Sequence, residues 1–174
     1  MKAVLISIQP KWCEMIASGK KTIEVRKTSP KIETPFKCYI YCTKQKTIAD
    51  EYCGNRNGHI YIDNGKVIGE FVCDDIIVDE RGENADVFSK YAQLSLVEQK
   101  KYGANKPLFG WHITDLKIYY KPKELGEFRK EGFMTEEQWL YALYPNTHCH
   151  YAAWAKRFEI TRPPQSWCYV EELL

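Results

Sequence analysis

The sequence has no long hydrophobic run. A membrane-spanning helix needs about 20 consecutive apolar residues, and no segment of the 174 residues approaches that length. The apolar run over residues 2–8 is also too short for the hydrophobic region of a secretory signal, and Pro10 and Lys11 follow it closely. These absences exclude the helical membrane proteins and predict a protein without a membrane partner.

Net charge is low as well. Lys and Arg number 25 and Asp and Glu number 23, so the formal net charge at pH 7 is +2. This balance excludes a polycation that holds nucleic acid by bulk charge, and it excludes an acidic disordered tail. The positive charge is nevertheless concentrated in one place, where Lys20, Lys21, Arg26 and Lys27 lie within eight residues beside a single acid, Glu24. Any charged partner must therefore be recognised by a local cluster.

Paired cysteine motifs are absent too. Seven cysteines, an odd number, are scattered through the chain without a C-x-x-C pair, and several occupy apolar runs such as residues 36–42. Free cysteine is a common small core residue, so this pattern favours a reducing, cytoplasmic location. His148, Cys149 and His150 alternate without a second pair at matching spacing, so neither a metal site nor a cofactor is predicted. The residue types alone leave a Cys–His nucleophile open.

Strand-like patterns dominate what is present. Apolar residues at helical spacing occur twice in the middle of the chain, over residues 84–91 and 95–102. Ser95 and Glu98 form a capping box at the start of the second of these segments, and Gly103 follows its end. The chain is therefore expected to form an α+β domain that is mainly β, consistent with a small barrel, with helices inserted between strands. Strands are predicted over 2–8, 22–27, 36–43, 59–63, 66–79, 109–120, 155–160 and 167–170, and helices over 11–18, 84–91, 95–102 and 135–143. Asn64-Gly65, between the strands 59–63 and 66–79, is typical of a type I′ hairpin turn.

The segment 22–27 predicts a strand with two unlike faces. Ile23 and Val25 fall on one face, and Thr22, Glu24 and Arg26 fall on the other. An arginine beside a carboxylate can hold a planar polar ligand through paired hydrogen bonds. On composition alone, however, a solvated strand face with a surface ion pair is favoured, because charged strand faces are common.

Glu70 is the second candidate for chemistry. It lies in an apolar strand, residues 67–73, so it is predicted to be buried, and a buried carboxylate needs a cation or several donors. Lys21 and Arg26 are natural partners. A buried ion pair between Glu70 and one of these cations is as typical of a structural role as of a functional site.

Three tryptophans lie beside polar or turn residues. Trp12 follows Lys11, Trp111 follows a glycine, and Trp167 follows Ser166. Aromatic rings next to basic residues suit base stacking. A single tryptophan taken alone is more often part of a core.

Residues 7–10 and 17–26, the latter reading Ala-Ser-Gly-Lys-Lys-Thr-Ile-Glu-Val-Arg, resemble the opening of ASCH domains in the PUA-like superfamily. The Gly69-Glu70-Phe71 strand fits the same family, and residues 162–170 resemble the ending of a bacterial and phage subset. The resemblance implies one ASCH/PUA-like domain over residues 1–174. It implies a pseudo-barrel of five or six strands, with helical insertions at about 84–103 and 124–151.

The same resemblance implies a cleft that binds RNA, other nucleic acid or a modified nucleobase. Carried over by motif, the cleft would contain Lys21, Glu24 and Arg26 from the second strand, with Trp12 from the first helix. Glu70 would come from the central strand. Trp167 is added from its own surroundings rather than from the family.

One branch of the family resembles an amidohydrolase that removes the acyl group from acetylated cytidine. Its proposed catalytic set is a lysine, a threonine and a glutamate, which fall here on Lys21, Glu24 and Glu70. Glu24 thus stands where that branch has its hydroxyl. A carboxylate at this position could act as a general base on water, with Lys21 stabilising a developing oxyanion.

Three functions therefore remain open. The favoured one is a module that binds RNA, single-stranded nucleic acid or a nucleotide-like molecule in a small basic cleft. An enzyme, hydrolysing modified nucleosides or RNA with Lys21, Glu24 and Glu70, is the first alternative. A protein–protein adaptor that uses the inserted helices and exposed aromatics is the second.

Overall fold

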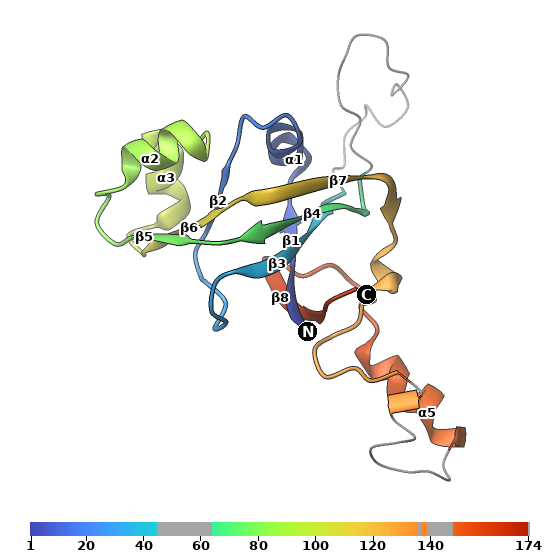
Figure 1. The fold of residues 1–174 in the computed structure, drawn as a ribbon. Coiled ribbons are helices and arrows are strands. Elements are labelled where there is room, and N and C mark those ends of the chain that lie inside the picture. The colour runs from blue at the N-terminus through green and yellow to red at the C-terminus, as the bar shows by residue number, and fades with distance from the viewer. Residues whose placement is uncertain (45–63, 136, 139–147, 174) are drawn as a thin grey trace.

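The structure, a computed structural model, describes residues 1–44, 64–135, 137–138 and 148–173. Its described strands form two sheets (Figure 1). A five-stranded sheet has the order β7-β4-β3-β1-β8, and a three-stranded sheet has the order β2-β6-β5. Only β1 and β3 run parallel among these paired strands. The strands are β1 (Lys2–Ile8), β2 (Ile23–Arg26), β3 (Phe36–Cys42), β4 (Val67–Cys73), β5 (Ile76–Asp79), β6 (Leu108–His112), β7 (Thr114–Lys123) and β8 (Trp167–Glu171).

Helices lie between and around the sheets. Helix α1 (Pro10–Ala17) connects β1 to β2, and helices α2 (Ala85–Tyr91) and α3 (Leu96–Gly103) connect β5 to β6. The α2–α3 pair lies beside the three-stranded sheet at one end of the molecule, whereas α5 (His148–Ala155) lies at the other end (Figure 1). Short 3-10 turns, η2 (Leu125–Glu127) and η3 (Lys156–Phe158), follow β7 and α5.

Three clusters of buried apolar side chains hold these layers together. The largest combines α1 and one face of the five-stranded sheet with Trp111 of β6, so it lies between the two sheets. A second covers the opposite face of the five-stranded sheet and includes Phe128, which packs edge-on against Tyr39 of β3. The third joins Ile23 and Val25 of β2 to the α2–α3 pair. β1 is buried on both faces because it contributes to two clusters.

The predicted α+β architecture, mainly β with inserted helices, is confirmed. The capping box that predicted the second inserted helix is present, because the backbone N–H of Ser95 donates to the Glu98 carboxylate at 2.8 Å. The predicted strands over 66–79 and 109–120 each divide into two, β4 with β5 and β6 with β7. The strand predicted over 59–63 lies outside the described residues, and the helix predicted over 135–143 lies mainly outside them.

One predicted element is wrong. Residues 155–160 were expected to form a strand, but α5 runs to Ala155 and the 3-10 turn η3 follows. Trp154 and Phe158, four residues apart, pack with their rings tilted and the ring centroids 4.6 Å apart, and Phe133 packs on both. Aromatic contacts at helical spacing outweigh the strand preference of the same residues.

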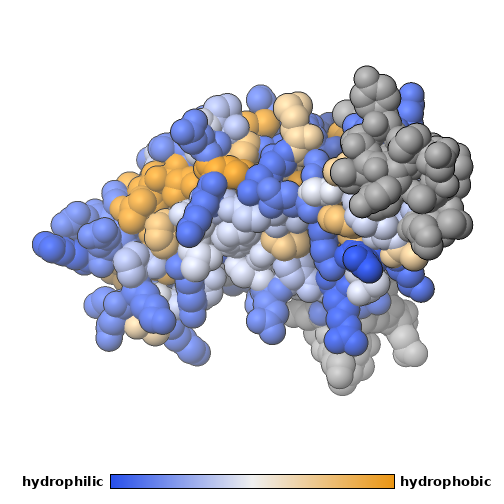
Figure 2. Space-filling model, turned by 90° about the horizontal axis from the view of Figure 1, so that it is seen from below, coloured by the Kyte–Doolittle hydropathy of each residue, from blue (hydrophilic) through white to orange (hydrophobic). Residues whose placement is uncertain are grey.

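Five described cysteines carry free thiols, and four of them are buried. Within the described part of the chain, no helix is long and apolar enough to cross a membrane. Figure 2 shows a mostly hydrophilic face with apolar side chains gathered toward the end that carries α2, α3 and β5. Val78 of β5 and Leu96 and Val97 of α3 are among the exposed large apolar residues. An adaptor function would require a surface of this kind.

Candidate functional site

A pocket of about 800 Å³ opens beside β2, where the end of β1, helix α3 and the loop before β8 approach one another. This volume lies within the range of small-molecule sites, about 300–1,000 Å³. Its walls come from five separate parts of the chain. The lining residues are Ser7, Ile8, Gln9, Trp12, Lys21, Glu24, Val25, Arg26, Lys27, Thr43, Leu94, Glu98, Lys101, Tyr102, Pro163, Pro164 and Gln165.

Strand β2 presents its charged face to this pocket. Ile23 and Val25 are buried on the other face against α2 and α3, so the alternation predicted from the sequence is present. The charged face is buried too, with Glu24 exposed by 6% and Arg26 by 7%. A solvated strand face with a surface ion pair is therefore excluded. Across the ladder Glu24 pairs with Trp111, which belongs to the core between the sheets.

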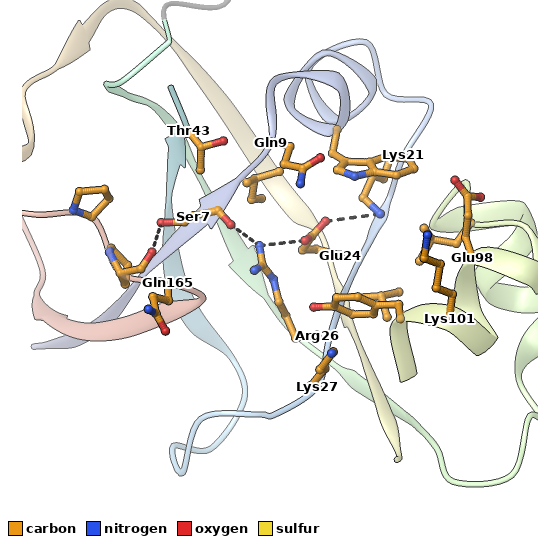
Figure 3. Close-up of a pocket in the computed structure, with 17 residues that line it drawn as sticks. Ser7, Gln9, Lys21, Glu24, Arg26, Lys27, Thr43, Glu98, Lys101 and Gln165 are labelled. Atoms are coloured by element: carbon orange, nitrogen blue, oxygen red, sulfur yellow. Dashed lines mark hydrogen bonds and ion pairs between the residues drawn. The ribbon is translucent and has the colours of Figure 1, made fainter. Parts of the chain in front are cut away.

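Three ionisable side chains form a row on this face. The Glu24 carboxylate lies between the Lys21 ammonium and the Arg26 guanidinium (Figure 3). Lys21 Nζ is 3.4 Å from Glu24 Oε2, and Arg26 Nη2 is 2.9 Å from Glu24 Oε1. Lys21 is only 2% exposed. We call these residues the Lys21–Glu24–Arg26 row.

Backbone carbonyls fix both ends of the row. Lys21 Nζ donates to the carbonyl oxygen of Ala92, just beyond α2, at 2.7 Å. Arg26 Nη2 donates to the carbonyl oxygen of Ser7 at 2.6 Å. The Ser7 hydroxyl in turn donates to the carbonyl of Pro164 at 2.6 Å, which ties the loop before β8 to the end of β1. These bonds hold the charged groups in place from three directions, as a preorganised binding site requires.

Burial shapes the protonation of this row. Burial is the largest cause that lowers the pKa of Lys21 below its ordinary value, and the neighbouring Arg26 charge lowers it further. The charge of Glu24 and its hydrogen bond to Lys21 act in the opposite direction. Lys21 therefore holds its proton less tightly than an exposed lysine does.

Aromatic rings and further cations line the same pocket. Lys21 Nζ lies 5.1 Å from the ring centroid of Trp12, and Lys27 Nζ lies 4.8 Å from that of Tyr102. Four basic and two acidic side chains line the pocket in total, an excess of two positive charges. The local charge is thus as large as the net charge of the whole chain.

The structure brings together four of the residues chosen from the sequence: Trp12, Lys21, Glu24 and Arg26. It does not bring Trp167 to the pocket wall. The Trp167 ring packs against Trp111 and Tyr169, and its Nε1 donates to the hydroxyl of Thr28 at 3.1 Å. Trp111 is fully buried and belongs to the core.

Glu70 lies away from the pocket as well. It is opposite Tyr39 in the ladder, and Tyr39 belongs to the core on the other face of the five-stranded sheet. The Tyr119 hydroxyl donates to its carboxylate, and Lys37 Nζ approaches it at 4.0 Å. The prediction that Lys21 or Arg26 would be its partner is therefore wrong, because β2 and Glu70 contact different sides of that sheet.

Several lining residues had no signal in the sequence. Lys101 and Tyr102 of α3 reach the pocket only through the chain's tertiary path, whereas Gln9 and Gln165 lie in the segments 7–10 and 162–170 that carry the family resemblance. The capping box predicted where α3 begins, but it did not predict which face of α3 lies toward β2. Among the described residues, no group of three or more His, Cys, Asp or Glu side chains is placed to hold a metal ion.

Comparison with known proteins points to one family. The sequence model of the ASCH domain matches residues 6–162. The fold is similar to the crystal structure of ASCH from Zymomonas mobilis, with a TM-score of 0.61 and 19% identity over 98% of this chain and 88% of that one. Two single-substitution mutants of the Z. mobilis protein match with TM-scores of 0.56 and 0.57, both at 18% identity. These matches cover 99% and 98% of this chain and 92% and 89% of the mutants. No curated protein matches the sequence.

Proposed function

The chain belongs to the ASCH domain family, and on that premise we propose that its pocket binds one unpaired nucleotide of RNA or another single-stranded nucleic acid. The observation that carries the proposal is the Lys21–Glu24–Arg26 row, a buried and fixed set of donors and acceptors in the wall of an open pocket. Buried charges at such a position are typical of sites that recognise a polar ligand.

The remaining lining fits the two other parts of a nucleotide. Trp12 and Tyr102 provide ring faces, and stacking on aromatic side chains is the usual way in which proteins hold unpaired bases. Lys27 and Lys101 are exposed at the pocket and provide cations for phosphate. Because these are the two exposed cations among the described residues that line the pocket, the proposal requires a short binding site rather than a long basic groove.

Binding of a fluorescently labelled six-nucleotide RNA of mixed sequence, followed by anisotropy, tests this function. Lys101→Ala is expected to weaken binding several-fold, and Lys100→Ala is its matched control, because both lysines are exposed on α3 and only Lys101 lines the pocket. Trp12→Ala is expected to cost about 1–3 kcal/mol of binding free energy, the usual contribution of one stacked base. Equal affinities for Lys101→Ala, Trp12→Ala and Lys100→Ala would refute the proposed site.

Hydrolysis of an acylated nucleoside is the second candidate, and the contact between Lys21 and Glu24 favours it. A lysine whose pKa is lowered by burial, beside a carboxylate, gives up its proton more readily than an exposed lysine does, as a group that transfers protons must. Glu70 cannot belong to this set in the observed fold, because it lies on the other side of the five-stranded sheet. A chromatographic assay with acylated cytidine tests the idea, and turnover no greater than that of Lys21→Met would reject it.

A further inference from the structure

The Lys21–Glu24–Arg26 row alternates in hydrogen-bonding character. An ammonium and a guanidinium only donate, whereas a carboxylate only accepts. Glu24 lies between the other two, so the row reads donor, acceptor, donor along one wall of the pocket (Figure 3). A ligand that faces the whole row must therefore present the opposite order, which is acceptor, donor, acceptor.

Each member of the row has hydrogen-bonding capacity to spare. The Lys21 ammonium carries three donors, and two of them are used by Ala92 and Glu24. The Glu24 carboxylate has about four acceptor sites, and its contacts within the row are those to Lys21 and Arg26.

Arg26 supplies an independent sign that a partner is missing. Its Nη2 and Nη1 groups reach Ser7, Glu24 and Ser166, but its Nε is buried and has no hydrogen-bond partner in the part of the chain that the structure describes. A buried donor that stays unpaired is costly, so such a group commonly meets an acceptor. Arg26 lines the pocket, and its Nη1 group, whose contact with the Ser166 hydroxyl is long at 3.5 Å, keeps a donor for a ligand oxygen.

Among unmodified bases, one type of pairing edge has the required order. Uracil and thymine present a carbonyl oxygen, the N3–H group and a second carbonyl oxygen, which is acceptor, donor, acceptor. Cytosine has a single donor at one end of its edge, and guanine has two adjacent donors. Adenine places an amino donor beside a ring acceptor. Each of these three would set a donor against a donor or leave an acceptor unpaired in the row.

We propose that the pocket recognises the imide edge of an unpaired uracil or thymine, with N3–H donating to Glu24 and the two carbonyl oxygens accepting from Lys21 and Arg26. This inference rests on the proposed nucleotide-binding function and names the base class that the site selects. Trp12 and Tyr102 stack on the base, while the Lys21–Glu24–Arg26 row forms hydrogen bonds with its edge. Selectivity is expected to be large, because a site built to hydrogen-bond a group rejects analogues that leave its buried polar atoms unpaired.

A change in the ligand tests the inference without altering the protein. Affinities of the wild-type chain are measured for six-nucleotide RNAs made of uridine, cytidine, adenosine or 3-methyluridine, and for the corresponding thymidine DNA. Uridine RNA is expected to bind at least about tenfold more tightly than the cytidine, adenosine and 3-methyluridine RNAs, a factor that corresponds to about 1.4 kcal/mol. Stacking alone would favour the larger adenine ring, so a preference for uridine over adenosine identifies edge recognition.

The outcomes separate this inference from the function on which it rests. Equal binding of uridine and 3-methyluridine RNA overturns imide recognition, while binding of either one upholds the nucleotide-binding pocket. If no hexanucleotide binds, the proposed function falls and this inference falls with it. Thymidine DNA that binds as tightly as uridine RNA supports imide recognition in both nucleic acids, whereas weaker thymidine binding supports it in RNA.

A pair of variants tests the role of the central acceptor. Glu24→Gln replaces one acceptor oxygen with a donor, so the preference for uridine over cytidine is expected to fall by about tenfold or more. Glu14→Gln is the matched control, because Glu14 is exposed on α1 and does not line the pocket. The control is expected to retain the wild-type preference. A Glu24→Gln protein that is folded by circular dichroism and keeps the full preference would overturn the inference.

Discussion

Removing the negative charge of Glu24 is the most direct perturbation of the buried row. In the folded protein this carboxylate is 2.9 Å from Arg26 Nη2 and 3.4 Å from Lys21 Nζ, and all three side chains are at least nine-tenths buried. Glu24→Gln would leave two buried cations whose other close partners are the carbonyl oxygens of Ala92 and Ser7. Breaking a buried ion pair typically costs about 3–5 kcal/mol. Because the glutamine oxygen can still accept one bond, we expect a loss of about 3 kcal/mol in the free energy of unfolding.

The loss in the free energy of unfolding caused by Glu24→Gln should depend on pH in a defined direction. Burial lowers the folded-state pKa of Lys21 below its ordinary value of 10.5, so the unfolded chain binds this proton more tightly. The free energy of unfolding therefore rises as pH increases from the folded-state pKa toward 10.5. Glu24→Gln removes the group that raises this pKa, so in the variant the rise begins at lower pH. The difference between the two proteins is expected to be smaller at pH 9.5 than at pH 6.

Urea unfolding at these two pH values measures both effects. Glu83→Gln is the control, because Glu83 is exposed and forms no ion pair with another described residue. Its effect is expected to lie within about 0.5 kcal/mol. A cost of less than about 1 kcal/mol for Glu24→Gln at pH 6, with an unchanged urea dependence, would refute the energetic role assigned to the buried charges.

Three further measurements test other parts of the structure. Removing the exposed cation Lys27 from the pocket should reduce the slope of log affinity for single-stranded RNA against log salt by about 0.7, and an unchanged slope would exclude a phosphate contact there. Phe128→Ala, in the core on the opposite face of the sheet, should lower the free energy of unfolding by about 3–5 kcal/mol. RNA affinity of the folded variant should not change, and weaker binding would contradict the separation of core and pocket. Gly69→Ala should cost about 1–3 kcal/mol in thermal or urea unfolding, because its Cβ would lie 2.4 Å from the carbonyl oxygen of Lys117 in β7. Gly126→Ala, which meets nothing within 4 Å, is the control, and equal effects of both would refute the close approach of β4 and β7.

The row shows how two interpretations of one sequence segment are distinguished by tertiary structure. Alternation in residues 22–27 predicts a strand with apolar and charged faces, and both faces are present. Alternation does not report what covers a face. Here α2 and α3 cover Ile23 and Val25, while the end of β1 and the loop before β8 cover Arg26. Burial converts an ordinary charged strand face into a fixed hydrogen-bonding array.

Glu70 illustrates the opposite case. Its apolar neighbours predict burial, but its side chain is 22% exposed and therefore only partly buried. Which side of the sheet it faces depends on strand register and on the irregularities in β4 next to Gly69 and Glu70. A shift of one residue turns every side chain to the other face, so local sequence alone does not place Glu70 with Lys21 or with Tyr119.

The sequence by itself determined most of the strands and helices and the residues whose chemistry suits binding or catalysis. Periodicity located β2 and its charged face, the Ser95–Glu98 capping box located α3, and the motif around residues 17–26 indicated the family. Only the tertiary structure decided which of these groups meet. It joined Lys21, Glu24 and Arg26 to Tyr102 of α3 and to the loop at residues 163–165, and it placed Glu70 across the sheet. The physical reason is that side-chain alternation and capping are properties of a few neighbouring residues. A pocket depends on strand order, register and the paths of distant loops.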